Sequence, residues 1–216
     1  MADSPQQHGG RSLTILVFNR RTLISFILLL GVICLITSNT FWRWMYPISY
    51  QSIIQSAAHT ASVDPLLVAS VIHVESKYKS EDVSHAGAIG LMQLMPDTAQ
   101  WIAVQMQQSG TDLGYGRGSQ NQDLAQPELN IRLGSWYIHY LTEQFHGNQV
   151  AAVAAYNAGP KRVKQWLASG TWDGQLVSIS RIPVGETRHF VDRVFYNYDL
   201  YKRIYGADAQ WKDRSK

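Results

Sequence analysis

Hydrophobic positions recur at helical spacing over most of this chain, and they predict a series of helices. The pattern indicates one helix from residue 50 to near Ser62. Asp64 suits an N-cap and Pro65 a first-turn position, so the following helix should begin at Pro65. A later helix should begin at Pro96 for the same reason. The pattern therefore favours a mainly helical domain.

A long amphipathic helix is predicted to start at Pro127 and to stop at Gly147 and Asn148. Before it, residues 105–123 are rich in Gln, Gly and Ser. They predict a loop within the domain, because helical periodicity resumes directly afterwards. The apolar positions of the long helix should lie mainly in the core: Ile131, Leu133, Trp136, Tyr137, Tyr140 and Leu141.

Residues 150–160 predict a helix rich in Ala and Val that ends sharply at Gly159 and Pro160. Tyr156 and Asn157 then lie at the end of that helix, where both are well placed to project into a cleft. The alternative is an ordinary core helix in which Tyr156 packs without a functional role.

Residues 161–180 predict a short helix and a loop. Trp166 and Trp172 in this region either stack on sugar faces or, as is more common, pack in the core. A final helix is expected over residues 186–205, with an apolar stripe of Phe190, Val191, Val194, Phe195, Tyr198 and Tyr201.

Residues 22–38 contain no charge and only Thr and Ser as polar residues. As a helix, about 17 residues at 1.5 Å each cover roughly 26 Å, just enough for a bilayer core. A cleaved signal peptide needs a shorter apolar core and a small-residue cleavage site, and this segment shows neither. A lipoprotein signal needs a small residue before Cys34, where Ile33 stands, and a buried core helix fits poorly with a segment apolar on every face. We favour an uncleaved membrane anchor.

The charges around this segment predict its orientation. The formal net charge of the chain is +3. The whole excess lies in residues 1–46, which leaves the body neutral and gives no support for nucleic-acid binding. Most of the basic residues precede the apolar segment, so the N-terminus should stay in the cytoplasm. The charged residues of this region are Arg11, Arg20, Arg21 and Arg43 against Asp3. Just after the apolar segment, an interfacial aromatic belt supports the same placement: Phe41, Trp42, Trp44 and Tyr46.

The chain contains one cysteine, Cys34, inside the predicted span. The domain that follows therefore has no possible disulfide and should be stabilised by packing alone.

Glu75 is the candidate catalytic group. It follows Val68, Val71 and Ile72 at i+7, i+4 and i+3, which places its carboxyl on the apolar face of the predicted helix or at its margin. Partial desolvation should raise the pKa of this carboxyl, the condition for a general acid at neutral pH. The alternative is a solvated carboxylate at a helix end, near Lys77.

The segment that follows, residues 84–95, combines small residues with a Gly-Leu-Met-Gln turn. Glycines let a backbone turn sharply and approach a ligand closely. We interpret residues 71–98 as one half of a cleft.

Four segments together resemble one family: Glu75-Ser76, GAIGLMQLMP at 87–96, AAYNAG at 154–159 and IPVGETRHFVDRV at 182–194. They are similar to the catalytic domain of soluble lytic transglycosylase-type enzymes, which share an all-α, lysozyme-like fold with goose-type lysozymes. The spacing of Asp123, Pro127, Asn130, Ile131 and Gly134 also resembles the family. The resemblance covers about residues 50–206.

The resemblance implies cleavage of the β-1,4 bond between N-acetylmuramic acid and N-acetylglucosamine in peptidoglycan, with a 1,6-anhydromuramoyl end as product. Glu75 would act first as acid and then as base. Ser84, Gln93 and Met95 would contact substrate on one side, and Tyr156 and Asn157 on the other. Glu186 and Arg188 would steady the cleft wall. The family usually has Tyr where this chain has Phe190, so one hydroxyl is lost.

No metal or cofactor is implied. The alternatives to a lytic transglycosylase are a goose-type hydrolytic muramidase and a non-catalytic peptidoglycan-binding scaffold of an envelope machine. Partners in such machinery, including secretion machinery, are not identified by the sequence. The expected organisation is a cytoplasmic N-terminus at 1–21, an inner-membrane anchor at 22–38, a linker at 39–49, a catalytic domain outside the cytoplasm at 50–206 and a polar tail at 207–216.

Overall fold

The computed structural model describes residues 19–111, 113–115, 121–206, 208 and 211. It divides into two compact units, Met1–Met45 and Tyr46–Lys216. In the first unit, the described residues form α1 (Arg20–Thr37) and α2 (Asn39–Met45). Helix α1 is long and apolar enough to cross a membrane, and the leucine and isoleucine side chains along it are exposed. The predicted membrane segment is thus a helix that buries no face.

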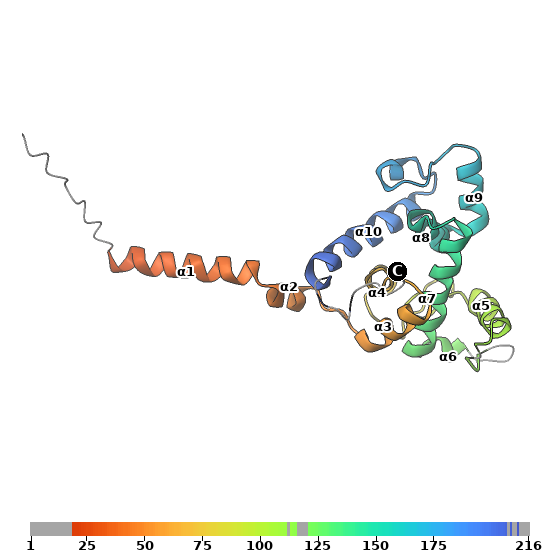
Figure 1. Ribbon diagram of the computed structural model, residues 1–216, viewed down its shortest axis with the longest axis horizontal. Helices are drawn as coiled ribbons and strands as arrows, with labels where there is room; N and C mark the ends of the chain where they lie inside the picture. The colour runs from red at the N-terminus through yellow and green to blue at the C-terminus, as the bar shows by residue number, and fades with distance from the viewer. Residues whose placement is uncertain (1–18, 112, 116–120, 207, 209–210, 212–216) are drawn as a thin grey trace, which may run out of the picture. The chain divides into compact units, whose positions relative to one another are not determined.

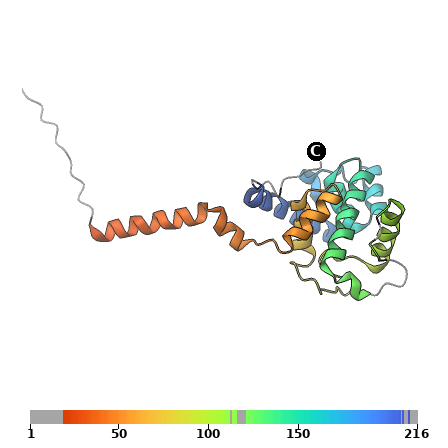
Figure 2. The ribbon, with the colours of Figure 1, turned by 60° about the horizontal axis from the view of Figure 1, so that its bottom comes forward.

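The second unit is all-helical apart from two isolated β-bridges, as far as its residues are described (Figures 1 and 2). Its elements are α3 (Gln51–Thr60), α4 (Pro65–Glu75), α5 (Pro96–Gln108), α6 (Asn121–Leu124), α7 (Pro127–Gln144), α8 (Gln149–Ala158), α9 (Pro160–Ala168), the 3₁₀ helix η1 (Leu176–Arg181) and α10 (Gly185–Tyr205).

Most of the predicted helix starts are confirmed. Pro65, Pro96 and Pro127 each occupy the first turn of a helix, and the Asp64 side chain accepts a hydrogen bond from the Leu66 amide at 2.8 Å. These boundaries were predictable because caps and first-turn prolines act locally. The predicted loop at 105–123 is shorter than expected, since α5 continues to Gln108. Part of that loop, residues 112 and 116–120, lies outside the described residues.

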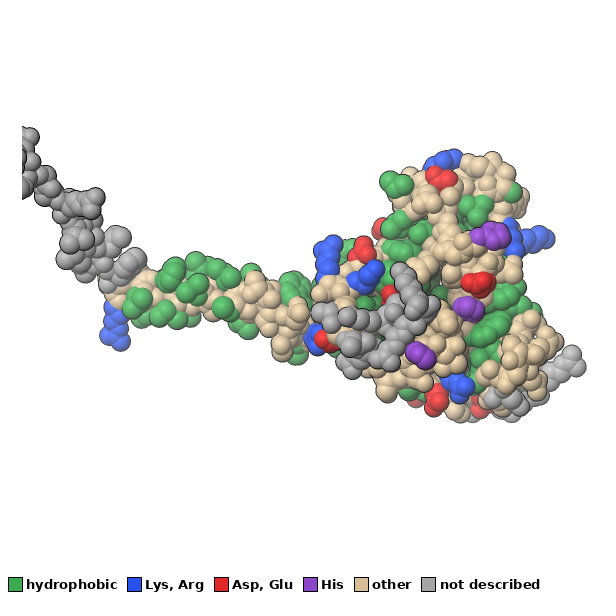
Figure 3. All heavy atoms as spheres, viewed as in Figure 1, with side chains coloured by type: hydrophobic (Ala, Val, Ile, Leu, Met, Phe, Trp, Pro, Cys, Tyr) green, Lys and Arg blue, Asp and Glu red, His purple; other side chains and the backbone are tan. Residues whose placement is uncertain are grey.

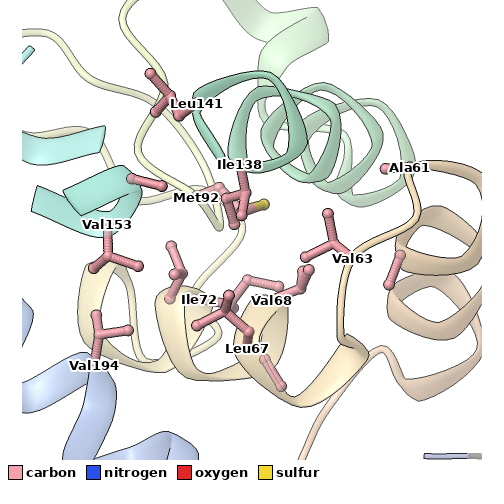
Figure 4. Packing of buried hydrophobic residues seen from close by; sticks show 14 of the residues in the cluster. Ala61, Val63, Leu67, Val68, Ile72, Met92, Ile138, Leu141, Val153 and Val194 are labelled. Carbon is pink, nitrogen blue, oxygen red and sulfur yellow. The ribbon is translucent and has the colours of Figure 1, made fainter. Parts of the chain in front are cut away.

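Helix α4 lies at the centre of the second unit, with α3, α7, α8 and α10 around it (Figure 1). Every residue from Pro65 to Ile72 is buried. Figure 4 shows Leu67, Val68 and Ile72 of α4 among side chains from the surrounding helices. The helix is therefore buried on every face until its last turn, which ends at Glu75.

Two groups of aromatic residues differ in their environment. Trp166 and Trp172 are buried, so the suggestion that they stack on sugars is wrong and they belong to the core. In α7, Ile131, Leu133 and Leu141 are buried as predicted, but three aromatic residues on the same helix are only half-buried: Trp136, Tyr137 and Tyr140.

Candidate functional site

Glu75 is the last residue of α4, where the central helix leaves the core. The pKa of its carboxyl is raised to about 8, first by burial and then by the negative charge of Glu186; the positive charge of Arg193 opposes both effects. The raised pKa expected from the sequence is confirmed. At neutral pH the carboxyl is therefore mainly protonated and can donate a proton.

The Gly-Leu-Met-Gln turn lies against the end of this helix. Ser76, which follows Glu75, donates a hydrogen bond from its hydroxyl to the Leu91 carbonyl at 2.8 Å. The turn begins at Gly90 with φ 82° and ends at Gln93 with φ 46°, both in the left-handed region. The Ser76 bond fixes the turn relative to the candidate acid.

Asn130 of α7 holds the other side of the turn. It accepts a hydrogen bond from the Met92 amide at 2.8 Å and donates to the carbonyls of Ile89 at 3.0 Å and Leu124 at 2.8 Å. A Cβ atom on Gly90 would lie 2.5 Å from the Asn130 side-chain nitrogen. Residue 90 must therefore be a glycine for the turn to approach the side-chain amide of Asn130.

Gly134, one turn further along α7, makes room for the same segment. A Cβ atom there would collide with the Met92 side chain, which is fully buried. The resemblance noted at Asn130 and Gly134 thus has a physical reason: both residues support the Gly-Leu-Met-Gln turn.

The other predicted site residues come from α8 and α10. Tyr156 donates a hydrogen bond from its hydroxyl to the Met92 carbonyl at 2.8 Å, so it joins α8 to the turn. The pKa of Tyr156 is raised well above its ordinary value, first by burial and then by the charge of Glu75. Tyr156 and Glu75 therefore share one electrostatic environment.

Asn157 accepts a hydrogen bond from the Thr187 hydroxyl at 2.6 Å, which links the end of α8 to the first turns of α10. Glu186 is exposed beside Thr187. Phe190 is 6% exposed and stacks on Tyr156, with 6.4 Å between ring centroids and 9° between ring planes. The phenyl ring thus orients Tyr156 by packing, in the absence of a hydroxyl of its own.

The remaining residues predicted to contact substrate are Ser84, Gln93 and Met95. Ser84 accepts a hydrogen bond from the Ala88 amide, and the Gln93 amide nitrogen donates to the carbonyls of Asp82 and Gly90. These bonds stabilise the hairpin-like segment itself. Met95 is 42% exposed at the start of α5.

Arg188 is partly buried, and its Nε atom makes no hydrogen bond to any described residue. Within the described part of the chain, no group of three or more His, Cys, Asp or Glu side chains is placed to hold a metal ion.

The structure adds three residues that sequence reasoning did not assign: Ser76, Asn130 and Thr187. Ser76 and Asn130 stood within recognised motifs, so their position was visible but their partners were not. Thr187 also stood in a motif, and only its hydrogen bond to Asn157 shows what it does.

Comparison with known proteins agrees with this geometry. A family model described as "Transglycosylase SLT domain" matches residues 52–176. The soluble lytic murein transglycosylase of Escherichia coli K12 is 32% identical over 164 residues, which cover 76% of this chain and 24% of that protein. Membrane-bound lytic murein transglycosylase C of Edwardsiella ictaluri is 27% identical over 180 residues, covering 72% of this chain and 47% of that protein. The chain spans about a quarter of the length of the soluble relatives.

Solved structures show the same fold. The 70 kDa soluble lytic transglycosylase SLT70 of Escherichia coli has a TM-score of 0.69 and 28% identity, covering 81% of this chain and 27% of that chain. An inactive mutant of the lytic transglycosylase Slt of Pseudomonas aeruginosa, with glutamine in place of a glutamate, has a TM-score of 0.66 and 30% identity, covering 92% of this chain and 33% of that chain. The predicted all-α, lysozyme-like fold is confirmed.

Proposed function

Because this chain belongs to the transglycosylase SLT domain family, we propose that it is a membrane-anchored lytic transglycosylase of peptidoglycan. It cleaves the β-1,4 bond between N-acetylmuramic acid and N-acetylglucosamine without water. The observation that carries the proposal is a buried carboxyl, Glu75, whose pKa is raised to about 8, next to Ser76, which is hydrogen-bonded to the Gly-Leu-Met-Gln turn.

The reaction needs one group that first gives and then takes a proton. Protonated Glu75 donates its proton to the glycosidic oxygen as the bond from C1 to that oxygen breaks. The C6 hydroxyl oxygen of the muramoyl residue then attacks C1, and the Glu75 carboxylate takes the hydroxyl proton. The product is a 1,6-anhydromuramoyl end, and Glu75 returns to its protonated form.

A pair of carboxylates, as in most glycosidases, is not required by this scheme. The charge of Glu186 reaches Glu75, but Glu186 is exposed and its effect is to raise the pKa of the acid. We assign Glu186 a positioning and electrostatic role, not that of a second catalytic group.

The substrate contacts are proposed on both walls. Met95 and the Gly-Leu-Met-Gln turn line one side, with Ser84 and Gln93 bracing it. On the other side Tyr156 and Asn157 flank the bond to be cleaved, supported by Arg188 and Phe190. The hydrogen bond from Tyr156 to Met92 supports a rigid centre in which both walls keep their spacing.

The proposed location is the inner membrane. Residues 22–38 form the anchor, 1–21 remain in the cytoplasm, and the catalytic domain proposed at 50–206 is extended by the buried Ile48 before it and the buried Trp211 after it. The apolar helix Arg20–Thr37 and the similarity to a protein named membrane-bound lytic murein transglycosylase C support an anchor.

Product analysis on intact sacculi tests the function. The wild-type protein should release anhydromuropeptides, and Glu75→Gln should reduce this release by at least about a hundredfold, the scale of a lost acid–base group. Products that carry an added water would indicate a hydrolytic muramidase instead. Equal release by both proteins would refute the role of Glu75.

A further inference from the structure

Three side chains around the end of α4 form a hydrogen-bonded chain that the proposed reaction does not use. The Tyr78 hydroxyl donates a hydrogen bond to the carbonyl of Ala69 at 3.1 Å. It also lies 3.2 Å from the Tyr201 hydroxyl, which in turn lies 3.2 Å from the Nδ1 atom of His73. The rings pack edge to face, with 6.0 Å between the centroid of His73 and that of each tyrosine. We call His73, Tyr78 and Tyr201 the α4–α10 network.

Two members of this network enclose Glu75 in the sequence. His73 precedes it by two positions in α4, and Tyr78 follows it by three. Between them the chain leaves the helix through Lys77 and Tyr78, which have φ values of 51° and 65°. Left-handed backbone is unfavourable for residues other than glycine, so this turn keeps its shape only while other contacts hold it. The contacts of the Tyr78 hydroxyl with α4 and α10 are such contacts.

The far end of the network belongs to the helix that places charges around the acid. Tyr201 is fully buried in α10, which also carries Glu186 and Arg193. Burial and Glu186 raise the pKa of Glu75, and Arg193 opposes them. A link between the end of α4 and α10 therefore also fixes the distance between the acid and the groups that adjust its pKa.

The number of available hydrogens determines the direction of each bond. Burial is the main reason why the pKa of both phenols is raised, that of Tyr201 to about 12, so each hydroxyl carries one hydrogen at neutral pH. The Ala69 carbonyl has no hydrogen to give, so the Tyr78 hydroxyl must donate to it. Tyr201 must then donate to Tyr78, and the last bond needs a hydrogen on Nδ1 of His73.

This count determines the tautomer of His73. Burial lowers the pKa of the ring, and the charges of Arg193 and Lys77 lower it further, so at neutral pH the ring is neutral and carries one hydrogen. That hydrogen lies on Nδ1. A hydrogen on Nε2 instead would leave one of the three contacts with two lone pairs facing each other. The tautomer of His73 therefore reports whether the whole network is intact.

Packing alone does not require these polar groups. Rings without hydroxyls would fill nearly the same space, and no buried hydroxyl would then need a partner. On the face of the second unit seen in Figure 3, acidic and basic side chains are interspersed and form no patch of one sign. The charges that act on Glu75 come from Glu186 and Arg193. A rigid link between α4 and α10 preserves the spacing of these two charges from the acid.

We propose that the α4–α10 network is a positioning device for Glu75. Its hydrogen bonds run from Nδ1 of His73 through the two tyrosine hydroxyls to the Ala69 carbonyl. They hold the turn that follows the acid against α10, and no step of the reaction uses their hydrogens. The effect on cleavage rests on the proposed function, whereas the direction of the hydrogen bonds does not.

Nitrogen NMR of the full-length protein in detergent tests the direction of the bonds. The chain contains seven histidines, so ¹⁵N labelling of imidazole gives few signals, and His73→Gln identifies the signal of His73 by its loss. The wild-type ring should carry its hydrogen on Nδ1. Tyr201→Phe should move the hydrogen toward Nε2 because its acceptor is lost. Tyr78→Phe should do the same, because the Tyr201 hydrogen is then free to be donated to Nδ1.

Steady-state cleavage of solubilised glycan strands tests the positioning role. Tyr78→Phe and Tyr201→Phe should each lower kcat about tenfold and change KM by less than about twofold, because a displaced acid slows the reaction without removing a substrate contact. Tyr196→Phe is the matched control, since it removes a hydroxyl from the same helix at a side chain that is 68% exposed. It should leave kcat and the His73 signal unchanged. Urea unfolding of each variant checks that it is folded under the assay conditions.

Two results would overturn the proposal. One is a wild-type His73 ring that carries its hydrogen on Nε2. The other is a kcat that is unchanged in Tyr78→Phe and Tyr201→Phe, or lowered equally in Tyr196→Phe. With either result the wild type still cleaves glycan and the proposed function stands. If the wild type cleaves no glycan, the proposed function fails, and the nitrogen spectrum alone decides the direction of the hydrogen bonds.

Discussion

At the scale of single residues, the chemistry depends on how one carboxyl is surrounded. Glu75 is the last residue of a helix that is buried from Pro65 to Ile72, and burial contributes most to its raised pKa. Glu186 and Arg193 act on it with opposite signs from α10. The position of Glu75 on an apolar face was readable from the sequence, but the charges that adjust its pKa belong to residues more than a hundred positions away.

These two charges predict opposite shifts in the pH dependence of cleavage. Activity should fall as pH rises through about 8, because the acid form of Glu75 is lost. Glu186→Gln removes a negative charge, so the pKa of Glu75 falls and the alkaline limb of kcat/KM moves to lower pH. Arg193→Gln should move that limb to higher pH.

A pH series of initial rates on solubilised glycan strands measures the alkaline limb for each of the two variants. The two variants serve as controls for each other, since a merely structural disturbance would not shift the limb in opposite directions. Shifts of the same sign in both variants would contradict the electrostatic interpretation.

At the scale of elements, the Gly-Leu-Met-Gln turn is held from three sides. Ser76 at the end of α4, Asn130 in α7 and Tyr156 in α8 each make a hydrogen bond to its backbone. The segment has almost no regular structure of its own, so its geometry is determined by these helices. Small residues on both sides, Gly90 and Gly134, allow the close approach.

Gly134→Ala should therefore destabilise the fold by about 1–3 kcal/mol, because the added methyl group must displace the buried Met92 side chain. Gly185→Ala is the matched control, since it is also helical and its Cβ would meet no atom within 4 Å. That variant should change stability by less than about 1 kcal/mol. Denaturant unfolding of both variants checks the difference, and equal effects would contradict the proposed packing role of Gly134.

At the scale of the whole molecule, the hydrophobic core lies entirely within the second unit. Its buried members run from Ile48 to Trp211 as far as the chain is described, and none belongs to the first unit. Tyr205 donates a hydrogen bond to the Tyr46 carbonyl at 3.0 Å. This bond joins the first residue of the second unit to the end of α10.

A chain that begins at Tyr46 should therefore fold without the anchor and remain soluble without detergent. A chain that begins at Tyr50 loses the Tyr205 bond and the buried Ile48, so it should be less stable by roughly 2–3 kcal/mol. Thermal and urea unfolding of the two truncated proteins measures this. Failure of the longer form to fold would show that residues 1–45 contribute to the core unit.

The sequence by itself determined most of the helix starts. Caps, first-turn prolines and the spacing of apolar residues act over a few positions, so starts such as Pro65 follow directly from the residue order. The same spacing placed Glu75 on the apolar face of its helix or at its margin, and left a solvated carboxylate as the alternative. The family of the chain was also readable, because its motifs are continuous segments.

Only the tertiary structure decided which distant groups meet. The bonds from Asn130 to the turn and from Thr187 to Asn157 join residues far apart in the chain, and local patterns do not specify partners. The same holds for the half-buried rings of α7, which periodicity placed in the core. Two of these rings, Tyr137 and Tyr140, line a pocket together with Trp101 of α5.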